Sequence, residues 1–240
     1  DASGARALPP AHGSLRPSLA PPTGPAGGRR WAQRPGPASE RPFIVAFWVD
    51  LPRGEGRRAA ETHCMGPGLA ALEKMISHTL GMSEPQVDGL ADLPGGPELS
   101  DFLGRCNGFY AFGDALHMFP SGSARLGELT LEDWNTEGLW REAYPNSLTG
   151  HLCFAEDAVG NQFTLSANGV FRFDAETAAM EFVAPNLDSW ALSVLADVNR
   201  LTGFPLAHAW RLRHGAVPPG HRLVPRRAFC RGGQLRVDNL

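Results

Sequence analysis

Two pairs of acidic residues mark the positions at which this sequence could place chemistry. Glu156 and Asp157 are adjacent and precede a glycine-containing loop, where a metal ion or a general base is conceivable. Adjacent residues of a strand point to opposite faces, so these carboxylates would converge only if the turn bends them. We therefore interpret them as solvated turn acids. Asp174 and Glu176 flank a predicted hairpin turn, and we interpret them as side chains that stabilise the turn.

Histidine and cysteine could provide metal or nucleophilic chemistry. His151 and Cys153 are two apart, so they share one strand face and could share a metal, but no third ligand is visible. A Cys–His nucleophilic pair stays open, because its members can be remote in the chain. Neither paired zinc-type spacing nor a phosphate-loop, dinucleotide or G-x-S-x-G motif occurs. We expect no metal, no cofactor and no enzymatic activity, with free thiols at Cys64, Cys106, Cys153 and Cys230.

An antiparallel meander followed by a helix must position these residues. Short apolar runs at 151–156, 162–166, 170–173 and 179–183 alternate with turn residues, and Asn168-Gly169 is a strong hairpin signal. We expect one buried and one wet face. Asn186 can cap the next helix, whose apolar positions recur at helical spacing up to Leu201, and Gly203 ends it.

Further elements precede and follow the meander. We predict a helix at about 68–80 and a second from Leu99 to Cys106, then strands at 109–112 and 115–119. Thr130 with Asp133 predicts the start of a third helix, irregular near Gly138. A short helix at 206–214 and strand-like pieces in 221–240 complete the chain. Helices, then strands, then helices indicate an α+β fold.

Charge is distributed unevenly over the 240 residues. The net charge is −3, with a balance of +4 over residues 1–67 and −7 over residues 68–240. We therefore expect no nucleic-acid partner. An acidic domain without catalytic motifs suits a basic protein partner, although ordinary solubility charge explains the balance equally well. The longest apolar run, residues 43–49, is far shorter than the roughly 20 residues of a membrane helix, so we expect no membrane contact.

The first 64 residues differ in composition from the rest. Residues 1–42 are rich in Pro, Gly, Ala and Arg without periodicity, which predicts a disordered extension over 1–64 and a folded domain over 65–240. Residues 43–49 could form a strand or a small docking patch. Met65 lies where the composition changes, which suggests that the natural protein could start there.

Several segments together resemble bacterial members of the SUKH superfamily, the Smi/Knr family. They are CNGFYAFGDALHMFP (106–120), the predicted helix with Trp134, Trp140 and Tyr144, FAEDAVGNQF (154–163), GVFRFDAETAAMEFVAP (169–185) with Trp190, TGFPLAHAW (202–210) and the ending RLVPRRAF…GG…VDNL. The resemblance covers about residues 66–240. It implies an α+β fold with a strongly bent mixed, largely antiparallel sheet flanked by helices, and it supplies no catalytic residues.

For bacterial members the resemblance implies an immunity protein that binds and neutralises a secreted polymorphic toxin, often a nuclease or a deaminase. We therefore expect a non-enzymatic, cytoplasmic protein whose partner is a cognate toxin. Our candidates for partner contacts are the predicted turn acids Glu156, Asp157, Asp174 and Glu176. One alternative is an intracellular regulatory scaffold of the fungal type. Another is an enzyme that uses Glu156 and Asp157 or a Cys–His pair.

Overall fold

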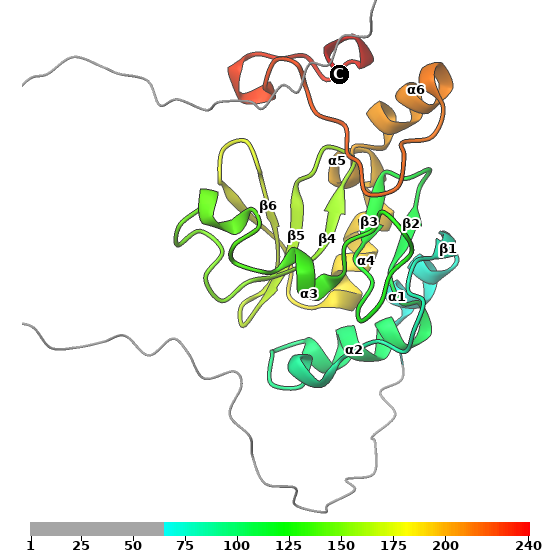
Figure 1. The fold of residues 1–240 in the computed structure, drawn as a ribbon, viewed down its shortest axis with the longest axis vertical. Coiled ribbons are helices and arrows are strands. Elements are labelled where there is room, and N and C mark those ends of the chain that lie inside the picture. The colour runs from blue at the N-terminus through cyan, green and yellow to red at the C-terminus, as the bar shows by residue number, and fades with distance from the viewer. Residues whose placement is uncertain (1–64) are drawn as a thin grey trace, which may run out of the picture. The chain divides into compact units, whose positions relative to one another are not determined.

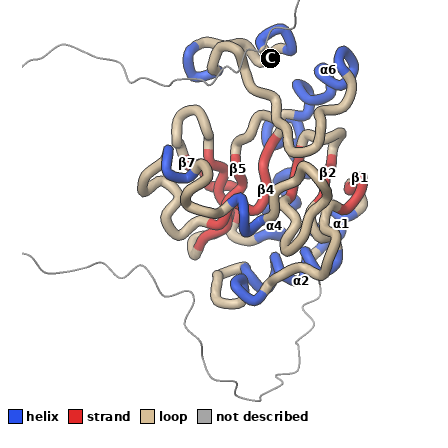
Figure 2. Tube along the Cα trace, in the orientation of Figure 1, coloured by secondary structure: helices blue, strands red, loops and turns tan. Residues whose placement is uncertain are grey.

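The computed structural model describes residues 65–240, and the predictions for residues 1–64 lie outside them. Seven strands form one sheet in chain order, and every neighbouring pair is antiparallel (Figure 1 and Figure 2). The sheet is therefore purely antiparallel within this region, where the resemblance implied a mixed sheet. The strands are β1 (Ile76–Thr79), β2 (Phe109–Ala111), β3 (Leu116–Met118), β4 (Leu152–Asp157), β5 (Gln162–Ser166), β6 (Gly169–Phe173) and β7 (Met180–Ala184).

Among the described residues six α-helices accompany this sheet, which confirms the predicted α+β class. We call the side on which α4 packs the back face and the side on which α3 lies the front face (Figure 1). Among residues 65–240, no helix has the length and apolar character needed to cross a membrane. The helices are α1 (Pro67–Glu73), α2 (Gly96–Arg105), α3 (Leu131–Trp134), α4 (Leu187–Ala196), α5 (Val198–Thr202) and α6 (Phe204–His214).

The main core lies between the back face and α4. Trp190 of α4 is fully buried, and its indole meets the rings of Phe154 and Phe163 edge to face at 4.9 and 5.5 Å. Asn186 caps α4, because its Oδ1 accepts from the Ser189 backbone N–H at 2.8 Å. Each large apolar side chain buried in this way contributes about 1.5–3 kcal/mol of transfer free energy. The predicted packing of this helix against the meander is therefore confirmed.

Three sequence predictions need correction. The helix predicted at 68–80 ends at Glu73, and Ile76–Thr79 forms the edge strand β1, whose Ile76 pairs with Ala111. Pairing with β2 gives these backbone groups partners that helical spacing alone did not reveal. The helix predicted through Leu201 is interrupted at Asp197, which has an extended φ of −139° and caps α5. The last segment forms 3₁₀ turns and no strand within residues 215–240.

The segment that crosses the front face is mostly irregular, as predicted. Thr130 Oγ1 accepts from the Asp133 N–H at 3.1 Å and starts α3, which lasts only four residues. Turns and a 3₁₀ helix at Arg141–Ala143 follow. Trp134 Nε1 donates to Gln162 Oε1 of β5 at 2.7 Å, which fastens this segment to the sheet. Both faces are therefore covered at β4 and β5, where the prediction of one wet face is wrong, whereas Phe182 of β7 stays 56% exposed.

Candidate functional site

A row of polar side chains crosses the front face from strand to strand. The backbone register pairs Tyr110 of β2 with His117 of β3, His117 with Glu156 of β4, and Glu156 with Gln162 of β5. Residues in register share one face of a sheet, so these four side chains lie next to one another. Their chain neighbours, such as Phe109 and Phe163, face the core on the other side.

His117 lies between two carboxylates. Its Nδ1 is 3.0 Å from Glu156 Oε1, and its Nε2 is 3.6 Å from Glu128 Oε2. The imidazole also stacks on the ring of Tyr110 at 4.6 Å between centroids. Tyr110 donates its hydroxyl to Glu128, at 3.0 and 3.1 Å from the two carboxylate oxygens. These residues are buried, so the contacts form in a medium of low polarity.

The positive charge next to these residues comes from Arg222, which lies in the segment that follows α6. Its Nη2 lies 2.6 Å from Glu156 Oε1, and its guanidinium lies 5.3 Å above the centre of the Tyr110 ring. We call Tyr110, His117, Glu128, Glu156 and Arg222 the His117 cluster. The cluster joins three strands (β2, β3 and β4), the loop before α3 and the C-terminal segment.

The cluster shifts the pKa values of its members. Burial alone would raise the pKa of Glu156, but Arg222, His117 and Gln162 outweigh it, so the pKa lies below its usual value. Burial lowers the pKa of His117, and Arg222 adds to this effect, whereas Glu156 and Glu128 oppose it. Burial raises the pKa of Tyr110, so the phenol stays a hydrogen-bond donor at neutral pH.

The structure places Glu156 and Asp157 in the interior. The interpretation of both as solvated acids, and as contacts for a partner, is wrong because both side chains are buried. Asp157 Oδ1 accepts from the backbone N–H groups of Val159 and Asn161 at 3.0 and 2.9 Å, while Oδ2 lies 2.8 Å from Arg172 Nη2. Burial raises the pKa of Asp157 in spite of these donors. The two carboxylates have separate partners, so they form no shared catalytic site.

The hairpin acids are engaged in structural contacts. Asp174 Oδ1 accepts from the N–H groups of Glu176 and Thr177 at 2.8 and 3.2 Å, which confirms its predicted role in the turn. Glu176 accepts from the N–H groups of Phe229 and Cys230 at 2.9 and 2.8 Å. It therefore fastens the C-terminal segment to this hairpin, a role that the sequence did not reveal.

The histidine and cysteine candidates do not come together. His151 Nδ1 lies 2.9 Å from Thr164 Oγ1, and buried Cys153 lies beside Arg141. Burial raises the pKa of both Cys106 and Cys153 to about 12, so neither is an activated thiol. The described residues contain no group of three or more His, Cys, Asp or Glu side chains able to hold a metal ion. Cys64 lies outside the described residues.

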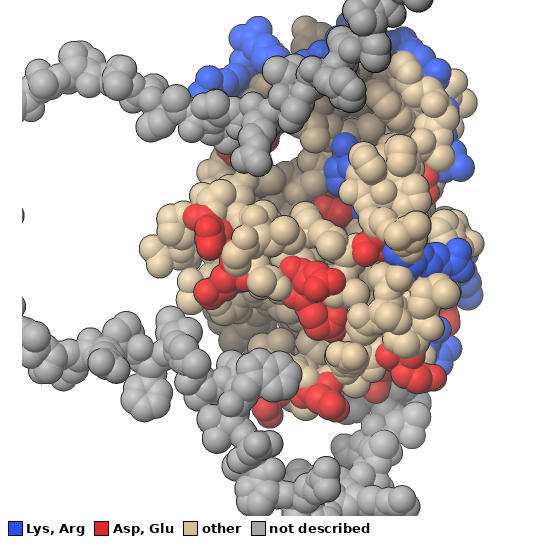
Figure 3. Space-filling view, in the orientation of Figure 1, with Lys and Arg blue, Asp and Glu red and all other residues tan. Residues whose placement is uncertain are grey.

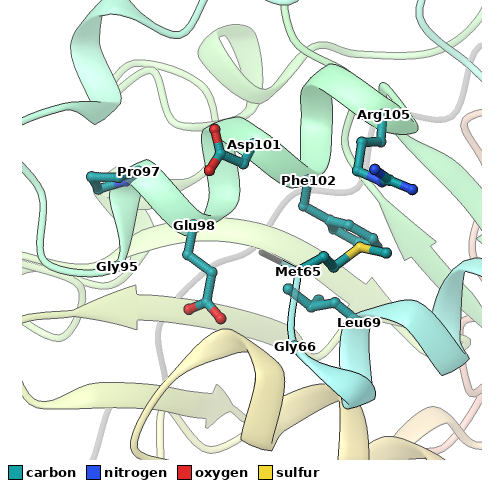
Figure 4. A pocket seen from close by; sticks show the side chains of 9 residues that line it. All are labelled: Met65, Gly66, Leu69, Gly95, Pro97, Glu98, Asp101, Phe102 and Arg105. Atoms are coloured by element: carbon teal, nitrogen blue, oxygen red, sulfur yellow. The ribbon is translucent and has the colours of Figure 1, made fainter. Parts of the chain in front are cut away.

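A pocket of about 330 Å³ between α1 and α2 carries no catalytic arrangement (Figure 4). Its most prominent polar group, Glu98, accepts from the backbone N–H groups of Leu187 and Asp188, both at 3.2 Å. Glu98 therefore helps to cap α4, in the way that acidic side chains commonly stabilise a helix N-terminus. Leu69 and Phe102 form apolar parts of the pocket wall. Because its main polar group is already used in capping α4, we regard this pocket as a gap between helices.

Of the four predicted contact acids only Glu176 is exposed, and a larger group of exposed acids lies elsewhere. Figure 3 shows acidic side chains gathered on the face that carries α3. Residues 65–203 carry nineteen acidic and six basic side chains, whereas residues 204–240 carry seven basic and one acidic. We call residues 129–142 the acidic segment; its exposed acids are Glu132, Asp133, Glu137 and Glu142.

The one cation of the acidic segment faces inward. Arg141 donates to Asn135 Oδ1 at 2.9 Å and to the carbonyl oxygens of Leu148 and His151 at 2.7 and 3.2 Å. It therefore does not pair with the exposed acids. Leu129 and Leu139 are also exposed on this segment, at 41% and 52%. As far as residues 65–240 are concerned, the surface therefore combines negative charge outside any ion pair with apolar side chains.

Comparison of the chain with protein-family models, with curated proteins and with solved structures finds no match to any of them.

Proposed function

We propose that this protein is a non-enzymatic, cytoplasmic immunity protein that binds and neutralises a secreted bacterial toxin. The observation that carries the proposal is the acidic segment, whose exposed carboxylates form no ion pair within residues 65–240 because Arg141 faces inward. Negative charge around exposed leucines suits a basic protein surface, such as the substrate-binding face of a nuclease. The resemblance of residues 66–240 to the SUKH superfamily supports the same function.

The proposed mechanism is occlusion. Long-range attraction between the acidic face and a basic toxin surface accelerates their encounter, and short-range contacts then hold the complex. The acidic segment lies on a rigid base, because Trp134 is hydrogen-bonded to Gln162 and stacks on Phe119 at 5.0 Å. A rigid surface loses little conformational entropy on binding, which favours tight association.

Capture of the product of an adjacent toxin-like reading frame tests this function. We expect the tagged wild-type protein to retain that product, and the double substitution Glu137→Lys with Glu142→Lys to slow association by roughly tenfold at low salt. Asp88→Lys with Asp92→Lys is the matched control, because it reverses two exposed acids on a different surface turn. Capture that is equally impaired by both double variants would contradict the assigned surface. Retention of host proteins without the toxin would favour a regulatory scaffold.

A further inference from the structure

A second pocket, of about 490 Å³, opens beside the His117 cluster. We call it the Tyr110 pocket. Its walls come from the end of β1, the loop before α3, α6 and the segment after α6, and they include the aliphatic side chains of Leu80, Val217 and Pro219. Tyr110, Glu128 and Arg222, all from the cluster, also line it. An apolar pocket with a few converging polar groups is the usual form of a ligand site.

Two of the cations that line this pocket already have ion-pair partners, although Arg222 Nε has no hydrogen-bond partner among the described residues. Arg222 lies 2.6 Å from Glu156, and Arg211 lies 2.7 Å from Asp114. Glu128 differs, although its side chain is only 2% exposed. Within residues 65–240, the Tyr110 hydroxyl is its only hydrogen-bond donor. A carboxylate can accept about four hydrogen bonds, so Glu128 retains free acceptor capacity toward the pocket.

The buried charges of the cluster do not balance. Two carboxylates, Glu128 and Glu156, share one guanidinium, that of Arg222. Burial lowers the pKa of His117, which keeps its imidazole neutral at pH 7, and its Nε2 has no hydrogen-bond partner among the described residues. A buried carboxylate without a cation is costly, so a positive group arriving from the pocket would be strongly favoured.

We propose that the Tyr110 pocket binds an alkylammonium group, from a free aliphatic amine or from a lysine side chain, with its nitrogen on Glu128. The aliphatic chain lies along Leu80 and Val217. This inference goes beyond the proposed function and does not depend on it.

The unpaired charges at the pocket distinguish a cationic from an anionic ligand. Arg125 lines the rim, is exposed and has no ion pair among the described residues. Solvent screens the charge of Arg125, whereas the side chain of Glu128 is only 2% exposed. An anion attracted by Arg125 would have to approach the free oxygen atoms of Glu128. A cation pairs with Glu128 and leaves Arg125 in water.

Isothermal titration calorimetry with pentylammonium chloride tests the proposal. Anionic sodium pentanoate and neutral pentanol serve as comparison ligands with chains of similar length. We expect pentylammonium to bind most tightly. Glu128→Gln keeps the shape of the side chain but removes its charge, so we expect at least about a tenfold loss of affinity. Arg125→Gln removes the opposing rim charge and should strengthen binding severalfold. Tighter binding of pentanoate, or an unchanged affinity in Glu128→Gln, overturns the proposal.

A second variant keeps the test decisive if Glu128→Gln does not fold. Ala216 lines the pocket and is exposed, so Ala216→Trp fills the cavity without disturbing the cluster, and it should abolish binding. Retained pentylammonium affinity in this variant contradicts the assigned site. Nα-acetyl-lysine methylamide distinguishes the sources: tighter binding than pentylammonium identifies a lysine side chain, and weaker binding a free amine. Failure of both probes to bind overturns the proposal.

Discussion

Replacement of Arg222 by methionine removes the only guanidinium of the His117 cluster. Methionine retains an aliphatic, flexible side chain, so the packing of the C-terminal segment changes little. Glu156 and Glu128 then stay buried without a cation. The side chains of Arg222 and Glu156 are only 13% and 6% exposed, so water cannot compensate for the missing charge.

The expected loss follows from this burial. Removing one partner of a buried ion pair costs about 3–5 kcal/mol of unfolding free energy, because the remaining charge is uncompensated. Loss of the guanidinium above the Tyr110 ring adds to the cost. For domains of this size, 1 kcal/mol lowers Tm by about 2–4 °C, so Arg222→Met should lower it by roughly 6–20 °C.

Urea unfolding followed by circular dichroism measures this loss. Arg200→Met is the matched control, since Arg200 pairs with Glu181 and Asp197 while 55% exposed. Exposed pairs contribute little, and we expect a change below about 1 kcal/mol. Glu156→Gln combined with Arg222→Met should be more stable than Arg222→Met alone, because one uncompensated charge is gone. Equal stability of Arg222→Met and Arg200→Met would refute this account of the cluster.

Three further outcomes follow from the structure. Trp190→Ala should cost about 3–5 kcal/mol in urea unfolding and Trp190→Phe clearly less, because the indole N–H has no acceptor among the described residues; equal losses would contradict this. As the pH decreases below 6.5, His117 is protonated more readily in the unfolded chain than in the folded protein, where its pKa is lowered, so the free energy of unfolding decreases. His117→Gln should make this decrease less steep between pH 7 and 5, and an unchanged slope would count against the reasoning. Iodoacetamide at pH 8, followed by peptide mapping, should modify exposed Cys230 and spare buried Cys106 and Cys153, whose early modification would show a more open structure.

Local signals in the sequence were sufficient for much of the fold. The predicted hairpin between β5 and β6 forms, with Ala167 and Asn168 in the turn and Gly169 already paired with Ser166, and Asn186 caps α4 as its residue type predicts. Both depend on backbone geometry within a few residues. The break at Asp197 was not predicted, because apolar spacing continues through it. The edge strand β1 was missed for a similar reason, since its partner β2 is remote in the sequence.

The candidate site was beyond sequence reasoning because its members meet only in the tertiary structure. Glu156 seemed to belong to a wet face, but the acidic segment and the segment with Arg222 cover that face. Alternation offered one usable signal: Tyr110 and His117 lie opposite the core-facing residues of the same strands. Nothing in the sequence links either residue to Arg222.

Growth rescue on co-expression tests the central claim most directly. The adjacent toxin-like reading frame is induced together with the wild-type protein, with Glu137→Lys plus Glu142→Lys, or with Asp88→Lys plus Asp92→Lys. The proposed function predicts that the wild-type protein and the control variant, Asp88→Lys plus Asp92→Lys, restore growth, whereas the variant of the acidic segment restores it poorly. Absence of rescue by the wild-type protein, although it is folded and expressed, would contradict the claim that this protein neutralises a toxin.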